Sequence, residues 1–254
     1  MTANKNGSLV SVVMAAYNAQ DTIASAIQSV LDQTYSNWEL LIIDDCSQDN
    51  TVSIVQSFAD ERIRLLVNKK NCGVSLTRKK GLDAAKGDWI AVLDSDDIWE
   101  PQKLKKQIEL SKLKNAKLIF TGSGFMDESG KRLDWQLHVP KRLTYRELLK
   151  QNLVSNSSVL VKKELYKKYY AIGDNMHEDF AIWLGISKEG IIAYGIDEPL
   201  LVYRLATSSK SSNKLKAAKM NWNTYRYVGL NPVQSFYYMC WYTVKGLQKY
   251  SHLK

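Results

Sequence analysis

The stretch WIAVLDSDD, from Trp89 to Asp97, decides the fold expected for this chain, because a short apolar run ends there in three carboxylates. The apolar run has the length of a buried strand. Three like charges cannot all remain ionised at a half-buried strand end without a counter-charge, and a divalent cation supplies one. Carboxylate oxygens suit Mg²⁺ or Mn²⁺, which also bind the phosphate oxygens of a substrate. The stretch predicts a metal–diphosphate site, with a solvated acidic turn before a helix as the alternative.

Apolar runs alternate with helical patterns on both sides of this stretch. Strands are expected over residues 9–15, 38–43, 63–67 and 89–93, and helices over residues 22–31, 50–58, 74–85 and 102–113. This alternation indicates an α/β fold with a mostly parallel sheet and helices on both faces. Ligands bind beyond the carboxyl ends of the strands in such sheets. We therefore expect residues 16–18, 44–45 and 94–97, which follow three of the strands, to meet at one rim.

The C-terminal half carries weaker patterns. Strands are expected over residues 117–123, 157–161 and 199–204, a turn over 127–130, and helices over 144–150 and 179–188. The first of these helices opens with a capping box formed by Thr144 and Glu147.

Charge is unevenly distributed along the chain. All 26 acidic residues lie at or before Glu198, whereas nine of the 35 basic residues follow it, so the net charge of +9 belongs to the last 56 residues. This tail is also rich in Trp and Tyr. Basic and aromatic residues without acids suggest contact with an anionic surface, either membrane headgroups or nucleic acid. Nucleic acid is the weaker option, because the acidic rim would repel it.

Other features narrow the class of protein. A chain of 254 residues suffices for one large α/β domain with an appendage. No apolar run predicts a membrane span, and residues 1–8 show no signal-peptide core. Three scattered cysteines predict neither a disulfide framework nor a zinc site. We expect a cytoplasmic protein.

Four ordered segments resemble family 2 glycosyltransferases: VVMAAYN at 12–18, VLDQTY at 30–35, LIIDDCSQDNT at 41–51 and LDSDDIW at 93–99. The resemblance implies a GT-A fold with a Rossmann-like sheet, a UDP-sugar donor and inversion at the anomeric carbon. It further implies a nucleotide-sugar-binding half over 1–115, an acceptor-binding half over 116–213 and a helical tail over 214–254. Within the family, the chain is similar to bacterial enzymes of capsule, O-antigen and teichuronic-acid synthesis, whose saccharide acceptors are often lipid-linked.

Some positions depart from the family pattern. Ala15-Ala16 stands where Pro-Thr or Pro-Ser is usual, and Cys46 replaces the common glycine. The Gln-x-x-Arg-Trp signature of processive synthases is absent from the sequence, which predicts one sugar added per encounter.

The resemblance also assigns donor-side roles. Tyr17 would stack on uracil and Asp45 would accept its N3–H, while Asp94 would contact ribose hydroxyls or metal-bound water and Asp96 would bind Mn²⁺ or Mg²⁺. The full donor-binding set is Ala15, Tyr17, Asn18, Asp44, Asp45, Arg78, Asp94 and Ser95. Asp97 would support the metal site without binding the cation directly. The alternatives are structural roles without ligand binding: Tyr17 as an aromatic residue that packs at the rim, Asp45 as a turn or helix-cap residue, and Arg78 as a solvated arginine on a helix.

An inverting reaction needs a base opposite the leaving group, and the resemblance assigns this role to Asp179. A helix N-cap is the alternative for this residue. His177, Glu178, Arg204 and Lys210 are candidate contacts to the acceptor or the diphosphate, with a plain surface loop as the alternative for the segment around Lys210.

Two rival functions remain open from the residues. A nucleotidyltransferase would share the acidic metal-binding rim, but it would need a glycine-rich basic loop after the first strand, and residues 15–20 contain neither glycine nor base. An anionic-surface binding module would act through the tail, alone or in addition to catalysis. We expect peripheral association with the inner face of the cytoplasmic membrane through residues 214–254, and this tail is also a candidate contact between copies of the chain.

Overall fold

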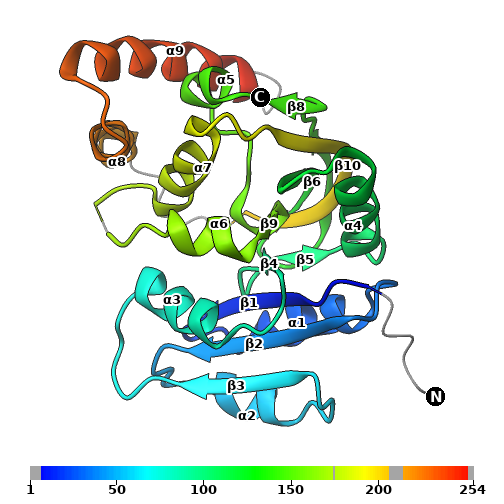
Figure 1. The fold of residues 1–254 in the computed structure, drawn as a ribbon. Coiled ribbons are helices and arrows are strands. Elements are labelled where there is room, and N and C mark those ends of the chain that lie inside the picture. Colours follow the sequence, from blue (N-terminus) through cyan, green and yellow to red (C-terminus); the bar gives the residue numbers. More distant parts are fainter. Residues whose placement is uncertain (1–6, 174, 206–213, 251–254) are drawn as a thin grey trace.

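The computed structural model describes residues 7–173, 175–205 and 214–250 (Figure 1). The described residues form one ten-stranded sheet with the strand order β3-β2-β1-β4-β9-β6-β10-β5. In addition, β7 pairs with β6, and β8 pairs with β10. The strands are β1 (Val10–Ala16), β2 (Trp38–Asp44), β3 (Ile63–Val67), β4 (Trp89–Val92), β5 (Ile98–Trp99), β6 (Leu118–Met126), β7 (Arg132–Leu137), β8 (Arg142–Leu143), β9 (Leu160–Lys162) and β10 (Ala193–Arg204).

Strands β1 to β4 pair in parallel within a mixed sheet, which confirms the predicted α/β class. The pairs β1–β2, β2–β3, β1–β4 and β6–β10 are parallel, and β9 is antiparallel to both of its neighbours, β4 and β6. The strand expected over 157–161 begins later, because residues 156–158 form a 3₁₀ helix, η1 (Asn156–Ser158). The short antiparallel strands β5, β7 and β8 were not predicted.

Helices cover both faces of the sheet. On one face lie α1 (Ile23–Leu31), α2 (Thr51–Gln56) and α4 (Lys103–Lys114). On the other face lie α3 (Val74–Ala84), α5 (Tyr145–Lys150), α6 (Lys163–Lys168) and α7 (Glu178–Lys188). Side chains alternate between the two faces along each strand. Val13 and Leu41 therefore pack on the face that carries α3 and α7, whereas Val12 and Leu40 pack on the face that carries α1 and α4. The predicted capping box at Thr144 and Glu147 is present.

Strand register brings the predicted strand ends to one rim. Ala16 at the end of β1 pairs with Asp44 at the end of β2, and Asp44 pairs with Val67 of β3. Val13 pairs with Val92, so the segment that follows β4 emerges beside the end of β1. The boundary expected at residue 115 falls between α4 and β6, and strands from both sides of it share the one sheet.

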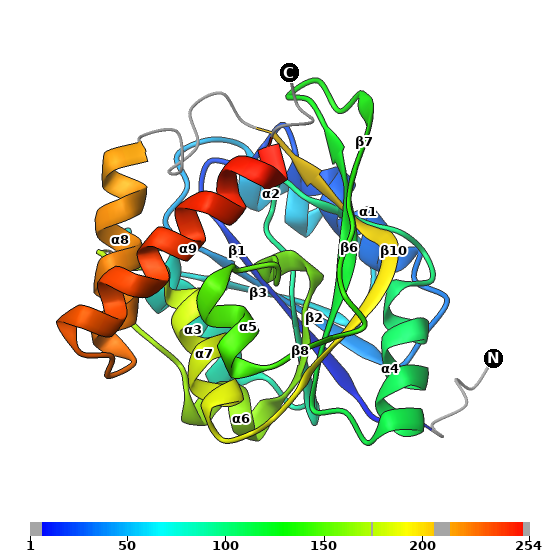
Figure 2. The ribbon, with the colours of Figure 1, turned by 90° about the horizontal axis from the view of Figure 1, so that it is seen from above.

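The C-terminal segment folds as α8 (Lys214–Tyr227) and α9 (Pro232–Tyr250), which are orange and red in Figures 1 and 2. Helix α8 packs against α7, and α9 lies across α5 and α8. Tyr225 and Leu230 are buried in the same core as α7. None of the helices in the described segments combines the length and apolar content needed to cross a bilayer.

Candidate functional site

The loop after β1 is held by the loop after β2. Asn18 adopts a left-handed backbone with a φ of 48°, and its N–H donates to Ser47 Oγ at 2.9 Å. In return Gln48 N–H donates to Asn18 Oδ1 at 2.8 Å. Tyr17, the preceding residue, is half exposed at this rim. Its ring is therefore accessible to a flat ligand at the strand ends, as donor stacking would require.

The two aspartates at the end of β2 are buried, and their oxygens organise backbone. Asp44 accepts from Ser47 N and Oγ. Asp45 accepts from Asn68 Nδ2 at 2.8 Å, Cys72 N at 2.9 Å and Gly73 N at 2.8 Å. Burial alone would raise the pKa of Asp45, but these hydrogen bonds outweigh it and the pKa is lowered. Asp45 therefore stays ionised and holds the 68–73 segment to the end of β2.

The four residues Asp94, Ser95, Asp96 and Asp97, here called the acidic tetrad, form a closed turn beyond β4. Asp97 N–H donates to Asp94 O at 3.1 Å, and Asp94 N–H donates to Ser157 Oγ at 3.1 Å, which fixes the turn to the η1 segment. Ser95 lies within the turn and is partly buried. Arg204, the last residue of β10, donates its N–H to Asp97 Oδ1 and its Nε to Asp96 O. Its Nη1 donates to the carbonyls of Asp127 and Glu128, so Arg204 braces the turn through backbone atoms.

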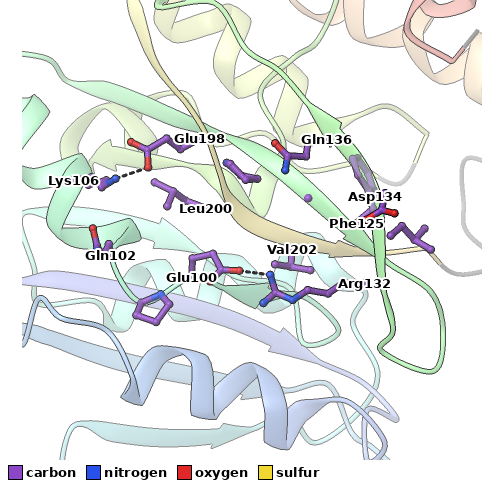
Figure 3. A pocket seen from close by; sticks show the side chains of 14 residues that line it. Glu100, Gln102, Lys106, Phe125, Arg132, Asp134, Gln136, Glu198, Leu200 and Val202 are labelled. Atoms are coloured by element: carbon purple, nitrogen blue, oxygen red, sulfur yellow. Dashed lines mark hydrogen bonds and ion pairs between the residues drawn. The ribbon is translucent and has the colours of Figure 1, made fainter. Parts of the chain in front are cut away.

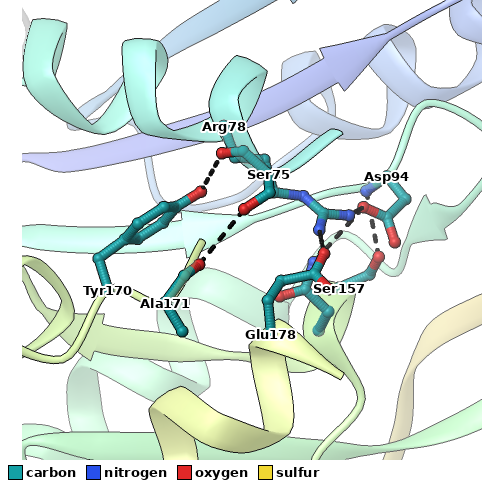
Figure 4. Close-up of polar contacts among 8 residues, drawn as sticks. Ser75, Arg78, Asp94, Ser157, Tyr170, Ala171 and Glu178 are labelled. Carbon is teal, nitrogen blue, oxygen red and sulfur yellow. Dashed lines mark hydrogen bonds and ion pairs between the residues drawn. The ribbon is translucent and has the colours of Figure 1, made fainter. Parts of the chain in front are cut away.

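Arg78 joins the tetrad to the start of α7 (Figure 4). The guanidinium donates to Asp94 Oδ1 through Nη2 and to Glu178 Oε1 at 3.1 Å through Nη1. The side chain is buried, which excludes the alternative of a solvated helical arginine. Burial disfavours its charge, yet Asp94 and Glu178 outweigh burial and the pKa of Arg78 is raised. Arg78 and Glu178, a hundred positions apart, thus link the acidic turn to the start of α7.

Further contacts hold α3 against the segment before α7. Tyr170 Oη donates to Ser75 O at 2.6 Å, and Ser75 Oγ donates to Ala171 O at 3.3 Å (Figure 4). These bonds keep the helix that carries Arg78 close to the chain that leads to Glu178.

The tetrad fits a divalent cation. Burial and the neighbouring Asp94 charge raise the pKa of Asp96, and burial with both neighbours raises the pKa of Asp97 well above its ordinary range. Asp97 Oδ2 is buried without a hydrogen-bond partner among the described residues. Crowded carboxylates with an unsatisfied oxygen are the hard donors that Mg²⁺ and Mn²⁺ accept. No group of three or more His, Cys, Asp or Glu side chains gathers as a metal cage in residues 7–173, 175–205 and 214–250, so a cation here would also need ligands from a substrate.

Helix α7 presents Asp179 in its first turn. The N-cap is His177, whose backbone N–H donates to Thr224 Oγ1 of α8 at 3.0 Å, so the N-cap alternative for Asp179 is wrong. Burial and the adjacent Glu178 raise the pKa of Asp179 to about 6, with His177 and Arg78 acting in the opposite direction. A carboxylate with this pKa is ionised at neutral pH and is a stronger proton acceptor than an ordinary aspartate.

The structure brings most of the predicted site residues to one edge of the sheet. Ala15 is in β1 next to Ala16, and Glu178 reaches the site through Arg78. Lys210 lies outside the described residues. Ser157, Asn68 and Thr224 support the site and were not predicted, because they are ordinary polar residues whose role depends on partners distant in sequence.

A separate cavity of about 550 Å³ lies between β10, β7 and the start of α4 (Figure 3). Two ion pairs, Arg132–Glu100 and Lys106–Glu198, border it. Phe125 and Val202 supply part of its apolar lining. No sequence pattern indicated this cavity, and it does not include the strand-end carboxylates.

Comparison with known proteins identifies the family. A model described as Glycosyl transferase family 2 matches residues 11–170. TuaG of Bacillus subtilis (strain 168), named as a teichuronic acid biosynthesis glycosyltransferase, is 41% identical over 220 residues, covering 86% of this chain and 87% of TuaG. WfgD of Escherichia coli, a UDP-Glc:alpha-D-GlcNAc-diphosphoundecaprenol beta-1,3-glucosyltransferase, is 37% identical over 244 residues, covering 96% of this chain and 95% of WfgD.

Solved structures share the fold. The S. aureus TarS fragment 1–349 in complex with UDP-GlcNAc superposes with a TM-score of 0.72 at 15% identity, covering 94% of this chain and 72% of that one. The mannosyltransferase PcManGT from Pyrobaculum calidifontis, in complex with GDP-Man and Mn²⁺, gives a TM-score of 0.69 at 15% identity, covering 98% and 71%. Fold, sequence match and strand-end site agree: the chain belongs to glycosyl transferase family 2 and is a glycosyltransferase with the GT-A fold.

Proposed function

We propose that the protein transfers a sugar, with inversion, from a UDP-sugar to a hydroxyl of a lipid-linked saccharide in the synthesis of a bacterial surface polysaccharide. The names of WfgD and of a second Escherichia coli relative, WfaP, specify UDP-Glc and a diphosphoundecaprenol-linked acceptor. WfaP is 32% identical over 243 residues. Membership of a glycosyltransferase family argues against the nucleotidyltransferase alternative.

The bridge through Arg78 is the observation that carries this proposal. It joins Asp94 of the acidic turn to Glu178, the neighbour of Asp179. Inversion requires a leaving group and a base on opposite sides of the reacting carbon. The bridge fixes the segment that would hold the diphosphate relative to the segment that would hold the base.

On the donor side, Tyr17 would stack its exposed ring on uracil, and Asp45 would accept the uracil N3–H. Asn18, Asp44 and Ala15 shape this rim through backbone and loop contacts. Asp94 and Ser95, both partly buried in the turn beyond β4, would contact the ribose and the diphosphate. Because Arg78 is occupied by two carboxylates, its role in donor binding is to orient Asp94.

A divalent cation, Mn²⁺ or Mg²⁺, would be held by Asp96 with indirect support from Asp97, and when bound it would neutralise charge on the departing UDP. Asp96 and Asp97 otherwise repel each other and Asp94, which explains their raised pKa values. Arg204 keeps the turn in place through its bonds to Asp96 and Asp97.

On the acceptor side, Asp179 would take the proton from the acceptor hydroxyl as that oxygen attacks the anomeric carbon. Its pKa of about 6 leaves it ionised at neutral pH and ready to bind a proton. His177 and Glu178 flank it and are the nearest candidates for contacts to the acceptor. Lys210 remains a candidate contact on sequence grounds. An acceptor carried on a lipid would place the enzyme at the inner face of the cytoplasmic membrane as a peripheral protein.

A donor screen tests this function. Purified protein is mixed with each common UDP-sugar and a lipid-diphosphate-linked sugar, with Mn²⁺, with Mg²⁺ or with a chelator, and UDP release is measured. We expect metal-dependent UDP release with one donor, together with a product of inverted anomeric configuration by NMR. Release of pyrophosphate from UTP and a sugar 1-phosphate, without UDP release from any UDP-sugar, or a product that retains the anomeric configuration, would contradict the proposal.

A further inference from the structure

Helix α9 has two apolar faces. The inner face packs on the core through Tyr238, Met239 and Tyr242. The outer face consists of side chains that are between 38% and 79% exposed: Val233, Phe236, Tyr237, Trp241 and Val244. Their spacing of three and four residues places them along one side of a helix. A helix that is apolar on both sides is normally covered on both, and here the described residues cover the inner side only.

The surroundings of this outer face are basic. Lys150 of α5 lies over the Trp241 ring at 5.1 Å. Every residue after Glu198 is neutral or basic, and α9 itself carries Lys245. The acidic residue of α5 is Glu147, whose carboxylate accepts hydrogen bonds from Thr144 N and Oγ1 in the capping box. The outer face therefore combines large apolar side chains with positive charge.

This combination of apolar side chains and positive charge favours an anionic bilayer, rather than a second copy of the chain, as the partner that covers the outer face of α9. A symmetric contact between two copies would place the same basic residues against each other, and like charges oppose that contact. Anionic headgroups instead complement the lysines while the aromatic side chains enter the boundary of the acyl chains. The helix carries too many polar residues to span the membrane and is suited to lying in the interface.

We propose that the outer face of α9, formed by Val233, Phe236, Tyr237, Trp241 and Val244, is a membrane-insertion surface for anionic lipid. The proposal rests on the proposed function in that it explains how a lipid-linked acceptor meets the enzyme. On the inner side of α9 the Tyr242 ring contacts Phe180, the residue after Asp179, at a centroid distance of 6.1 Å. Insertion would therefore hold the start of α7 close to the bilayer, where the sugar of a lipid-linked acceptor is located.

Vesicle flotation of the full chain, without donor or acceptor, tests this surface. Vesicles of phosphatidylcholine are compared with vesicles that also contain phosphatidylglycerol. We expect binding to the anionic vesicles that weakens as salt is raised. The double variant Phe236→Ser/Trp241→Ser should bind at least about tenfold more weakly, because it removes two large inserting side chains. The matched control is Leu113→Ser, which changes a side chain that is 76% exposed on α4.

Several outcomes would overturn the proposal. The first is that the wild-type protein does not bind anionic vesicles. The second is that the double variant binds them as strongly as the wild-type protein does. A third is a dimer in size-exclusion chromatography that the double variant dissociates while vesicle binding is absent, which would assign the face to a second copy. Retained UDP-sugar hydrolysis by the double variant shows that it folds. Vesicle binding by a protein that fails the donor screen would keep this surface and reject the proposed reaction.

Discussion

The carboxylates at the end of β2 lie at the same rim as those of the tetrad and of α7. The two groups differ in their hydrogen-bond partners and in the direction of their pKa shifts. Asp45 is satisfied by three hydrogen bonds from the 68–73 segment, and its pKa is lowered. Asp96 and Asp179 are crowded by other carboxylates, and their pKa values are raised. Satisfied carboxylates hold loops, whereas crowded ones keep affinity for a cation or a proton. The difference separates carboxylates that also hold loops in place from those proposed to bind a cation or a proton.

Asp179→Asn gives the largest expected effect. Transfer should fall by about 10³-fold, because an amide cannot take the acceptor proton. UDP binding by calorimetry should be nearly unchanged. The thermal midpoint should not fall at neutral pH, since a carboxyl with a raised pKa favours its neutral form in the fold and Asn is neutral. Normal turnover of this variant would remove Asp179 from the mechanism.

Asp96→Asn should lower transfer by about 100-fold, through loss of a cation ligand. Calorimetric titration of Mn²⁺ in the presence of UDP should show weaker metal binding, and this readout does not depend on turnover. Glu61→Gln, at an exposed carboxylate away from the rim, is the control and should leave both measurements unchanged. Wild-type metal affinity in Asp96→Asn would place the cation on other ligands.

Asp45→Ala should act mainly on stability. It removes the acceptor of the partly buried Cys72 N–H and one of the two acceptors of Gly73 N–H, which should cost about 1–3 kcal/mol in the free energy of unfolding. Urea denaturation measures this loss. Asp83→Ala, which removes an exposed carboxylate from α3, should change stability by less than about 0.5 kcal/mol. Equal losses in the two variants would remove the distinction between a supporting carboxylate and a surface one.

The pH dependence of transfer is the smallest of these effects. Asp179 must be deprotonated to act as base, and its pKa of about 6 predicts a rate that falls about tenfold per pH unit below that value. The acid limb should vanish in the residual activity of Asp179→Asn. A wild-type profile that stays flat down to pH 4 would contradict the raised pKa.

Most of the rim formed by the ends of β1, β2 and β4 could be predicted, because it depends on patterns within short segments of the sequence. Apolar runs that end in Asp44-Asp45 and in the tetrad define parallel strands, and the carboxyl ends of parallel strands meet at one rim. The bridge from Arg78 to Glu178 could not be predicted from pattern, because an arginine on a polar helix face is normally solvated. Only the packing of α3 against the segment before α7 buries it between two carboxylates.

The C-terminal tail shows the same division. Its charge and aromatic content are properties of composition and can be counted along the chain. Which aromatic side chains are buried and which remain exposed depends on the side of α9 that meets α5 and α7.

The sequence by itself determined which segments of the first half form strands, the positions of the strand-end acids and the basic tail, because each follows from the period of apolar residues or from composition. The tertiary structure decided which acids are satisfied, which arginine links the two sides and which face of the last helix stays open. Those outcomes depend on contacts between residues far apart in the chain, where burial and neighbouring charge set the pKa and the partners of each group.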